Sequence, residues 1–157
     1  MPPQRLTPTA SSPAARQRMK ATRQRDTAAE LALRKLLHRR GFRYRVDYPP
    51  IPGVRRRADV VFRRARIAVF VDGCFWHGCP DHSTWPQANA SWWREKILAN
   101  KRRDADTDRR LDDAGWQVLR VWEHESPAEA AERVARAVTA ALSDDLGDAA
   151  EDQAASE

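Results

Sequence analysis

The sequence predicts an α/β fold in which a small mixed β-sheet is flanked by helices. Short apolar or alternating segments typical of strands are interspersed with longer segments whose apolar residues recur at helical spacing. Their order is helix, three strands, helix, strand, helix, which combines neighbouring strands with a helical crossover. At 157 residues the chain can bury one hydrophobic core, and we expect a single domain over residues 16–142.

The first helix is predicted to begin at Thr27, because Thr27 and Glu30 have the spacing of a capping box. Leucines at helical spacing follow, and Gly41 is placed to end the helix. Over residues 42–47 apolar and aromatic residues alternate with charged ones, which predicts a strand. The proline-containing segment 48–57 predicts a loop.

Two short apolar segments, Ala58–Phe62 and Ile67–Val71, are predicted to form a β-hairpin closed by the residues between them. A long polar helix is expected over Trp92–Ala114. Ser91 is placed to cap its beginning and Gly115 to end it.

The last part of the chain predicts one strand and one helix. Trp116–Trp122 is rich in β-branched and aromatic residues. Ser126 and Pro127 predict the start of the final helix, because proline is favoured at the first helical position, and an apolar stripe carries it to Leu142. Residues 143–157 contain six acids and no base, and we expect them to be unstructured.

Charge is distributed unevenly along the chain. The net charge is +6 and the sequence pI about 10.0, and because residues 143–157 contribute −6, residues 1–142 carry +12. This predicts a polyanionic partner such as nucleic acid, although an arginine-rich protein from a GC-rich genome would have a similar balance. No apolar run is long enough to span a membrane, and the N-terminus has no apolar signal core, so we expect neither membrane insertion nor export.

The N-terminal segment divides in two. Residues 1–15 contain four prolines and no periodicity, so we expect them to be disordered. In residues 16–25 every charged residue is basic, which suits either an arm that contacts phosphates, through Lys20 and Arg23 among others, or a solvated tail.

The segment Val69–His82 concentrates the residues capable of chemistry. It begins as an apolar strand and then contains two acids, both cysteines, two of the four histidines and a Phe-Trp pair. Strand ends that open into loops often carry functional side chains. The two cysteines favour metal binding over a disulfide in a cytosolic chain. We therefore place the functional site in this segment.

Two acids are placed on the predicted hairpin. Asp59 lies inside one strand, and Asp72 ends the other. A carboxylate in a strand is costly unless it is paired or binds a cation, and two acids converging at one end could hold Mg²⁺ for phosphodiester hydrolysis. This is the outline of a restriction-endonuclease-like fold, although Cys74 stands where a lysine usually follows the second acid. The alternative is that Asp59 pairs with an arginine of Arg55–Arg57.

Cys74, Cys79 and His82 have the residue types of a tetrahedral zinc site, and His124 is the natural fourth ligand. Four protein ligands would leave no position for water, so such a zinc ion would be structural. His77 then remains a candidate for general acid–base chemistry, an alternative ligand to His82, or a solvent-exposed side chain.

Aromatic residues surround the presumed zinc ligands. Phe75 and Trp76 lie between them, and Trp85, Trp92 and Trp93 follow. Such residues can wedge between base steps of DNA, whereas the simpler interpretation of any one of them is a core side chain.

The long helix carries a charged surface. Lys96 and Arg102 are candidates for phosphate contacts, and Asp104 could face the site through a water molecule. The alternative for all three is a solvated helix face.

Four segments together resemble the very-short-patch repair (Vsr-type) DNA mismatch endonucleases. They are Met19-Lys-Ala-Thr-Arg with Asp26-Thr-Ala-Ala-Glu30, Pro52-Gly-Val with Ala-Asp59-Val-Val, Asp72-Gly-Cys-Phe-Trp-His77, and Gly115-Trp-Gln-Val-Leu-Arg-Val-Trp-Glu. The resemblance covers roughly Arg16 to Glu125 in the family's order, and Gly-Cys-Phe-Trp-His is its most specific motif.

The resemblance implies a restriction-endonuclease-like fold with a structural zinc ion. It also implies a Mg²⁺-dependent nick on the 5′ side of the T in a T·G mismatch, which arises when 5-methylcytosine deaminates. A functional link to a cytosine-5 DNA methyltransferase follows, and mismatch-repair proteins are candidate partners. We accordingly expect a cytoplasmic, nucleoid-associated bacterial enzyme. We expect a monomer, because no apolar stripe beyond the predicted core is left for a partner.

The resemblance also assigns roles to residues. Asp59 matches the catalytic metal-binding aspartate and His77 the catalytic histidine. Glu30 matches a helical glutamate near the active site, although its place in the capping box explains it equally well. Asp104 matches an acid that helps hold the metal's water. The wedge aromatics of the family match Phe75, Trp76 and Trp93.

The chain departs from the best-known member of the family at two places. A histidine stands there in place of Asp72, after a residue (here Val71) whose backbone carbonyl binds the metal, so Asp72 is a candidate direct metal ligand. The zinc loop is shorter and His124 replaces a cysteine, which leaves His82 and His77 as alternatives. A non-catalytic zinc module that binds distorted DNA, or a sequence-specific restriction nuclease, would share many of these features.

Overall fold

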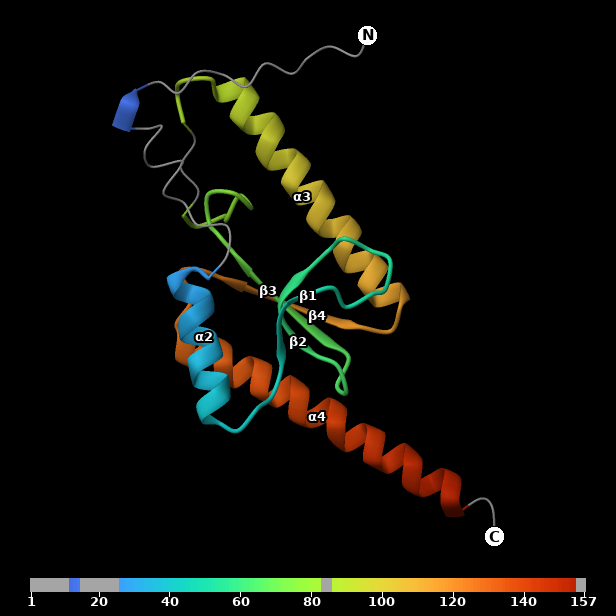
Figure 1. Ribbon diagram of the computed structural model, residues 1–157. Helices are drawn as coiled ribbons and strands as arrows, with labels where there is room; N and C mark the ends of the chain where they lie inside the picture. Colours follow the sequence, from blue (N-terminus) through green and yellow to red (C-terminus); the bar gives the residue numbers. More distant parts are fainter. Residues whose placement is uncertain (1–11, 15–25, 83–85, 155–157) are drawn as a thin grey trace.

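The structure, a computed structural model, describes residues 12–14, 26–82 and 86–154 (Figure 1). The predicted segment 16–25, with Lys20 and Arg23, and Trp85 lie outside these residues, as do 1–11 of the predicted N-terminal tail. None of the described helices is long and apolar enough to cross a membrane. The helices and strands follow the predicted order: α2 (Ala28–Arg39), β1 (Arg45–Tyr48), β2 (Ala58–Phe62), β3 (Ile67–Asp72), α3 (Ala90–Asp113), β4 (Gln117–Trp122) and α4 (Pro127–Ala154).

The four strands form one mixed sheet in the order β1-β2-β3-β4. β1 pairs antiparallel with β2, and β2 pairs antiparallel with β3, with Val60 opposite Val69. β4 pairs parallel with β3, because the crossover through α3 returns the chain in the same direction. The predicted mixed sheet flanked by helices, and the predicted β2–β3 hairpin, are confirmed.

Helices cover both faces of the sheet. α2 and α4 lie on one face and α3 on the other (Figure 1). The larger core lies under α2 and α4, where Leu33, Leu37, Val134 and Val138 pack against buried side chains of β2 and β3. On the opposite face Leu111 of α3 packs against Val61 and Ala68.

The beginning of α2 is the predicted capping box. Thr27 is the N-cap, and its hydroxyl accepts a hydrogen bond from the Glu30 backbone N–H at 3.3 Å. The Glu30 carboxylate returns to the backbone N–H of Asp26, one residue before the cap, at 2.9 Å.

Several predicted boundaries differ from the structure. The first strand spans Arg45–Tyr48, so the prediction over 42–47 is wrong for 42–44 and misses Tyr48. α3 begins at Ala90, after Asn89 in the left-handed conformation, so Ser91 is not its N-cap. α4 continues to Ala154, and residues 143–154, expected to be unstructured, are helical: the segment contains no proline, and its one glycine, Gly147, costs a helix only about 1 kcal/mol.

Candidate active site and metal centre

Asp59 lies on β2, where the β2–β3 ladder ends. Its Oδ2 accepts a hydrogen bond from the backbone N–H of Val71 at 2.7 Å, and no other hydrogen bond to Asp59 occurs among the described residues. Burial above all, together with the negative charges of Glu30 and Asp72, raises the pKa of Asp59 to about 6, although the hydrogen bond from Val71 lowers it. The alternative pairing with Arg55–Arg57 does not occur, because Arg56 bonds Asp106 and Arg57 bonds Asp47.

The backbone of Val71 faces the same place. Successive residues of a strand direct their N–H and C=O groups to opposite sides. The carbonyl of Asp72 accepts from the N–H of Glu123 at 2.9 Å, on the β4 side, so the N–H and C=O of Val71 are directed toward β2. A carboxylate and a backbone carbonyl are oxygen ligands suited to Mg²⁺, and an ionised Asp59 with little other stabilisation fits a cation.

His77 is held by Asp104 of α3. The two side chains meet at 2.5 Å between His77 Nδ1 and Asp104 Oδ2, while Asp72 Oδ1 lies 3.7 Å from the same nitrogen. Burial lowers the pKa of His77, but the hydrogen bond that His77 donates to Asp104 and the charges of both carboxylates outweigh burial and raise the pKa. Because Nδ1 is occupied, Nε2 is the nitrogen left to exchange a proton with a substrate.

Asp72 is engaged by Arg120 of β4. Both carboxylate oxygens lie 3.0 Å from Arg120 Nη1, and the Asp72 residue is only 5% exposed. Burial raises the pKa of Asp72, and the positive charge of Arg120 opposes that rise. The two acids of the hairpin therefore have different surroundings: Asp72 is paired with an arginine, whereas Asp59 receives only a backbone hydrogen bond.

Glu30 is buried but fully engaged at the beginning of α2. Besides the N–H of Asp26, its carboxylate accepts from the hydroxyl of Thr27 at 3.2 Å and from Arg34 at 2.9 Å. These contacts explain Glu30 as a residue that caps the helix. Its charge still raises the pKa of Asp59.

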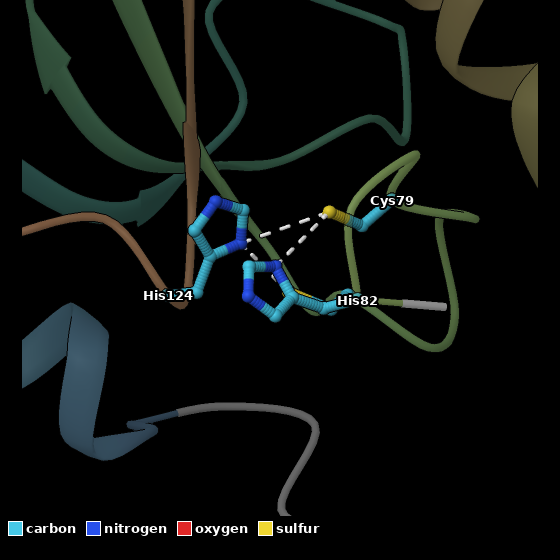
Figure 2. Close-up of side chains that lie close together, drawn as sticks. Cys79, His82 and His124 are labelled. Carbon is cyan, nitrogen blue, oxygen red and sulfur yellow. Dashed lines mark hydrogen bonds between the residues drawn. The ribbon is translucent and has the colours of Figure 1, made fainter. Parts of the chain in front are cut away.

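Four cysteine and histidine side chains form a second cluster, beside the group of Asp59, Asp72, His77 and Asp104. One ligand atom from each of Cys74, Cys79, His82 and His124 lies within 4.8 Å of every other. Figure 2 shows Cys79 and the two histidines converging: Cys79 Sγ lies 3.8 Å from His82 Nδ1 and 3.7 Å from His124 Nδ1.

These distances are suited to a tetrahedral metal ion. A thiolate and an imidazole bound to one zinc ion are about 3.6 Å apart. Cys74 Sγ lies closer to His124 Nδ1, at 3.0 Å. The cluster contains His82 and not His77, whose imidazole is turned to Asp104 instead. The cluster is therefore able to hold a metal ion.

The loop after β3, which carries His77 and the cluster residues Cys74 and Cys79, is packed closely on α3. Gly78 has a φ of +62°, and a Cβ atom there would lie 3.0 Å from Ile97 Cγ2 and 2.6 Å from Lys101 Cε. Asn100, which is buried, donates a hydrogen bond from Nδ2 to the carbonyl of Trp76 at 2.8 Å. Packing against α3 thus fixes the residues on both sides of His77.

The aromatic side chains gather at the beginning of α3. The ring centroids of Phe75, Trp76 and Trp93 lie 5.2–5.8 Å from one another, and Trp92 lies 4.7 Å from Trp93. All four are half-buried, so the cluster forms a partly open aromatic surface rather than a closed core. On the same helix Lys96 and Arg102 are exposed.

Sequence reasoning did not single out three residues that shape the site. Arg120 and Asp108 form an ion pair of 2.6 Å beside Asp72, and Asn100 holds the loop. A signal for Arg120 was present, because a charged residue in the middle of the strand Gln117–Trp122 must find a partner.

A half-buried carboxylate at the end of a strand pair, a histidine oriented by an aspartate and a neighbouring Cys/His cluster on a mixed sheet are features of metal-dependent nucleases. Comparison with known proteins agrees with this class. A sequence model of the family described as "DNA mismatch endonuclease Vsr" matches residues 10–83. The chain belongs to this Vsr family of endonucleases.

Individual relatives match over a longer range. The type II nicking enzyme V.NaeI of Lentzea aerocolonigenes is 46% identical over 114 residues, 71% of this chain and 69% of the relative. V.XorIIP of Xanthomonas oryzae, also called a type II nicking enzyme, is 38% identical over 68% of this chain and 77% of its own length. The DNA mismatch endonuclease Vsr of Escherichia coli K12 is 39% identical over 67% of this chain and 66% of the relative.

Proposed function

We propose that the protein is a Mg²⁺-dependent endonuclease that nicks one strand of duplex DNA on the 5′ side of the T in a T·G mismatch. The nick would begin repair where 5-methylcytosine has deaminated. The observation that carries this proposal is that the His77–Asp104 pair lies at the end of the sheet where Asp59 meets the last residues of β3. Membership of the Vsr family supports the choice of DNA, and of a mismatch, as substrate.

Asp59 and the backbone carbonyl of Val71 would hold Mg²⁺. A bound Mg²⁺ ion would stabilise the negative charge that develops on the attacked phosphate and acidify water. Asp72 was a candidate direct ligand by sequence, but Arg120 contacts both of its oxygens at 3.0 Å, which favours a carboxylate held in an ion pair over a metal ligand. Glu30, engaged by its own helix, would act on Asp59 through its charge alone.

His77 would move the proton. Asp104 accepts from Nδ1 and stabilises the charged imidazole, so Nε2 can deliver a proton to the leaving oxygen or take one from the attacking water. Asp104, predicted to act through water, would thus act by direct contact with His77.

The aromatic surface of Phe75, Trp76 and Trp93 would enter the DNA beside the mismatch. A T·G pair is easier to unstack than a matched pair, which would give the wedge its selectivity. The exposed Lys96 and Arg102 would contact phosphates, as would Lys20 and Arg23 of the N-terminal segment.

We infer that the Cys74, Cys79, His82 and His124 cluster binds a structural zinc ion. Thiolate and imidazole ligands favour zinc over Mg²⁺, and four protein ligands leave no position for substrate. The ion would join the loop after β3 to the end of β4 and so hold the segment that carries His77. We further infer that residues 16–142 form a restriction-endonuclease-like domain. We also infer that the protein acts as a monomer in the bacterial cytoplasm, in association with the nucleoid.

A second candidate function is strand nicking at a defined sequence in association with a restriction–modification system. The relatives named type II nicking enzymes favour it. Both candidates imply a cytosine-5 DNA methyltransferase as a functional partner, and mismatch-repair proteins remain candidates under the first. A non-catalytic zinc module would have no need of a histidine oriented by an aspartate.

The test is a nicking assay on end-labelled duplexes that share one sequence and differ only in a T·G or a C·G pair, with and without Mg²⁺. A single Mg²⁺-dependent cut before the mismatched T supports the proposal. Equal cutting of the C·G duplex would contradict the proposal and indicate a sequence-specific nuclease that does not need a mismatch. Tight binding of the mismatched duplex without a cut, over a panel of flanking sequences, would indicate a non-catalytic zinc module that binds distorted DNA.

A further inference from the structure

Arg120 is the centre of a charged network that links three elements. It lies on β4, and its guanidinium contacts Asp72 at the end of β3 at 3.0 Å and Asp108 of α3 at 2.6 Å. Its Nη2 also lies 3.4 Å from the carbonyl of Asp104. The guanidinium carbon lies 4.7 Å from the ring centroid of Phe70, so the arginine is supported by an aromatic side chain as well as by acids.

This network ends at His77. Asp72 is the second carboxylate near the imidazole, with Oδ1 3.7 Å from Nδ1, against 2.5 Å for Asp104 Oδ2. A small movement of Asp72 would bring it within hydrogen-bond distance of Nδ1. Both oxygens of Asp72 are instead 3.0 Å from Arg120, and this contact prevents the movement.

We propose that Arg120 is a positioning residue of the active site. By occupying Asp72, it leaves Asp104 as the one hydrogen-bond partner of His77 Nδ1 among the described residues, and so fixes the direction in which Nε2 points. The inference rests on the proposed nuclease function for its consequence in catalysis, but the geometry of His77 can be tested without it.

Lysine is a poor substitute for this role. The guanidinium contacts Asp72 through Nη1 and Asp108 through Nη2 and Nε, so one side chain restrains β3 against α3. A lysine ammonium offers one point of charge and no fixed fork. Arg120→Lys should therefore keep only part of the effect.

The experiment measures single-turnover nicking of a T·G duplex at saturating protein, together with DNA affinity. Arg120→Gln should lower the rate roughly 10- to 100-fold, the range expected when an acid–base group is misdirected, with the affinity within about twofold of wild type. The nicking rate of Arg120→Lys should fall between those of wild type and Arg120→Gln. Adding Asp72→Asn to Arg120→Gln removes the unpaired carboxylate and should recover most of the rate. A double variant no faster than Arg120→Gln would overturn the proposal.

Arg56→Gln is the matched control. Arg56 also ties a loop to α3, through the hydroxyl of Thr107, the carboxylate of Asp106 and the backbone carbonyl of Arg103, but none of these three partners is among the groups that contact His77. The Arg56→Gln variant should have a lower free energy of unfolding than wild type and a nicking rate within about twofold of wild type. An equal loss of rate in Arg56→Gln and Arg120→Gln would show that tethering α3 is all that Arg120 does, and would overturn the proposal.

A second readout does not depend on cleavage. In Mg²⁺-free protein, ¹⁵N NMR of the imidazoles reports whether His77 Nδ1 carries the proton donated to Asp104. Arg120→Gln should change the His77 signals, and the double variant should restore them. If wild type proves unable to nick DNA, the proposed function fails, while this measurement still decides the position of His77. Unchanged His77 signals in Arg120→Gln would overturn the inference.

Discussion

Nδ1 of His77 lies 2.5 Å from Oδ2 of Asp104, although 27 positions separate the two residues in the sequence. The contact joins the loop after β3 to the middle of α3. It gives the imidazole one orientation, and Asp104 favours its charged form. A residue of a loop thereby acquires the fixed direction that proton transfer requires.

The first prediction concerns this pair. Asp104→Asn keeps the size and an acceptor oxygen but removes the charge that stabilises the protonated imidazole, so the single-turnover nicking rate should fall roughly 10- to 100-fold. Asp106→Asn is the control, because Asp106 pairs with arginines (Arg56, Arg109 and Arg110) and not with His77. Equal rates for wild type and Asp104→Asn would contradict the assignment of the pair.

The second prediction separates catalysis from stability at Asp59. Asp59→Asn should abolish Mg²⁺-dependent nicking, since an amide is a weak ligand for Mg²⁺. Without added Mg²⁺ it should stabilise the fold at pH 7, because burial raises the pKa of Asp59 to about 6 and the ionised form therefore costs stability. Two pKa units correspond to at most about 3 kcal/mol.

The pH dependence of that stability difference follows from its sign. Ionisation of Asp59 lowers the free energy of unfolding by its full amount above the folded pKa of about 6. This loss of stability disappears as the pH falls toward the unfolded pKa of 3.8. The stability gap between Asp59→Asn and wild type, measured by urea unfolding, should therefore narrow from pH 7 to pH 5. A gap that widens toward acid, or a variant that nicks at the wild-type rate, would remove Asp59 from its assigned role.

The sequence predicted the order of elements because each helix and strand has a local signal. It placed the first strand too early because alternation reports burial rather than strand pairing. Phe42 and Tyr44 point to the same side and pack on Phe62, with ring centroids 6.1 and 5.9 Å away, yet they precede the first paired residue, Arg45. Aromatic packing alone produced a strand-like pattern there.

The site could be predicted where its residues are contiguous. Segment 69–82 was recognised by composition alone, and the cluster of its cysteines with His82 and His124 confirms that they come together. The contacts of Asp72 could not be predicted, because its partner Arg120 comes from β4, 48 positions away. Two acids on one hairpin indicated a shared cation, whereas the fold gives one of them an arginine.

The third prediction concerns the Cys/His cluster. Purified protein should contain one zinc ion per chain by mass spectrometry of the metal, and His124→Ala should lose it. Losing the ion should cost at least about 2 kcal/mol, or roughly 4–8 °C in Tm for a chain of this size, because the loop after β3 is joined to β4 through these ligands.

His38→Ala is the matched control for the metal measurement. His38 lies exposed in the last turn of α2 and outside the cluster, so this variant should keep a full complement of zinc. Full zinc in His124→Ala would exclude His124 as a ligand. Zinc lost from His38→Ala as well would point to nonspecific loss during purification.

The last prediction uses two glycines to separate backbone strain from crowding. Gly53 and Gly78 have φ values of +79° and +62°, so alanine at either position adopts an unfavourable left-handed conformation and costs about 1–2 kcal/mol. A Cβ at Gly53 meets nothing within 4 Å, whereas one at Gly78 meets Ile97 and Lys101. Lys101 can move aside, but Ile97 is buried.

Gly78→Ala should therefore be less stable than Gly53→Ala in urea unfolding. It should also nick more slowly, because displacing this loop from α3 moves His77 away from Asp104. Equal effects of the two substitutions on stability and rate would show that the loop does not depend on its close packing against α3.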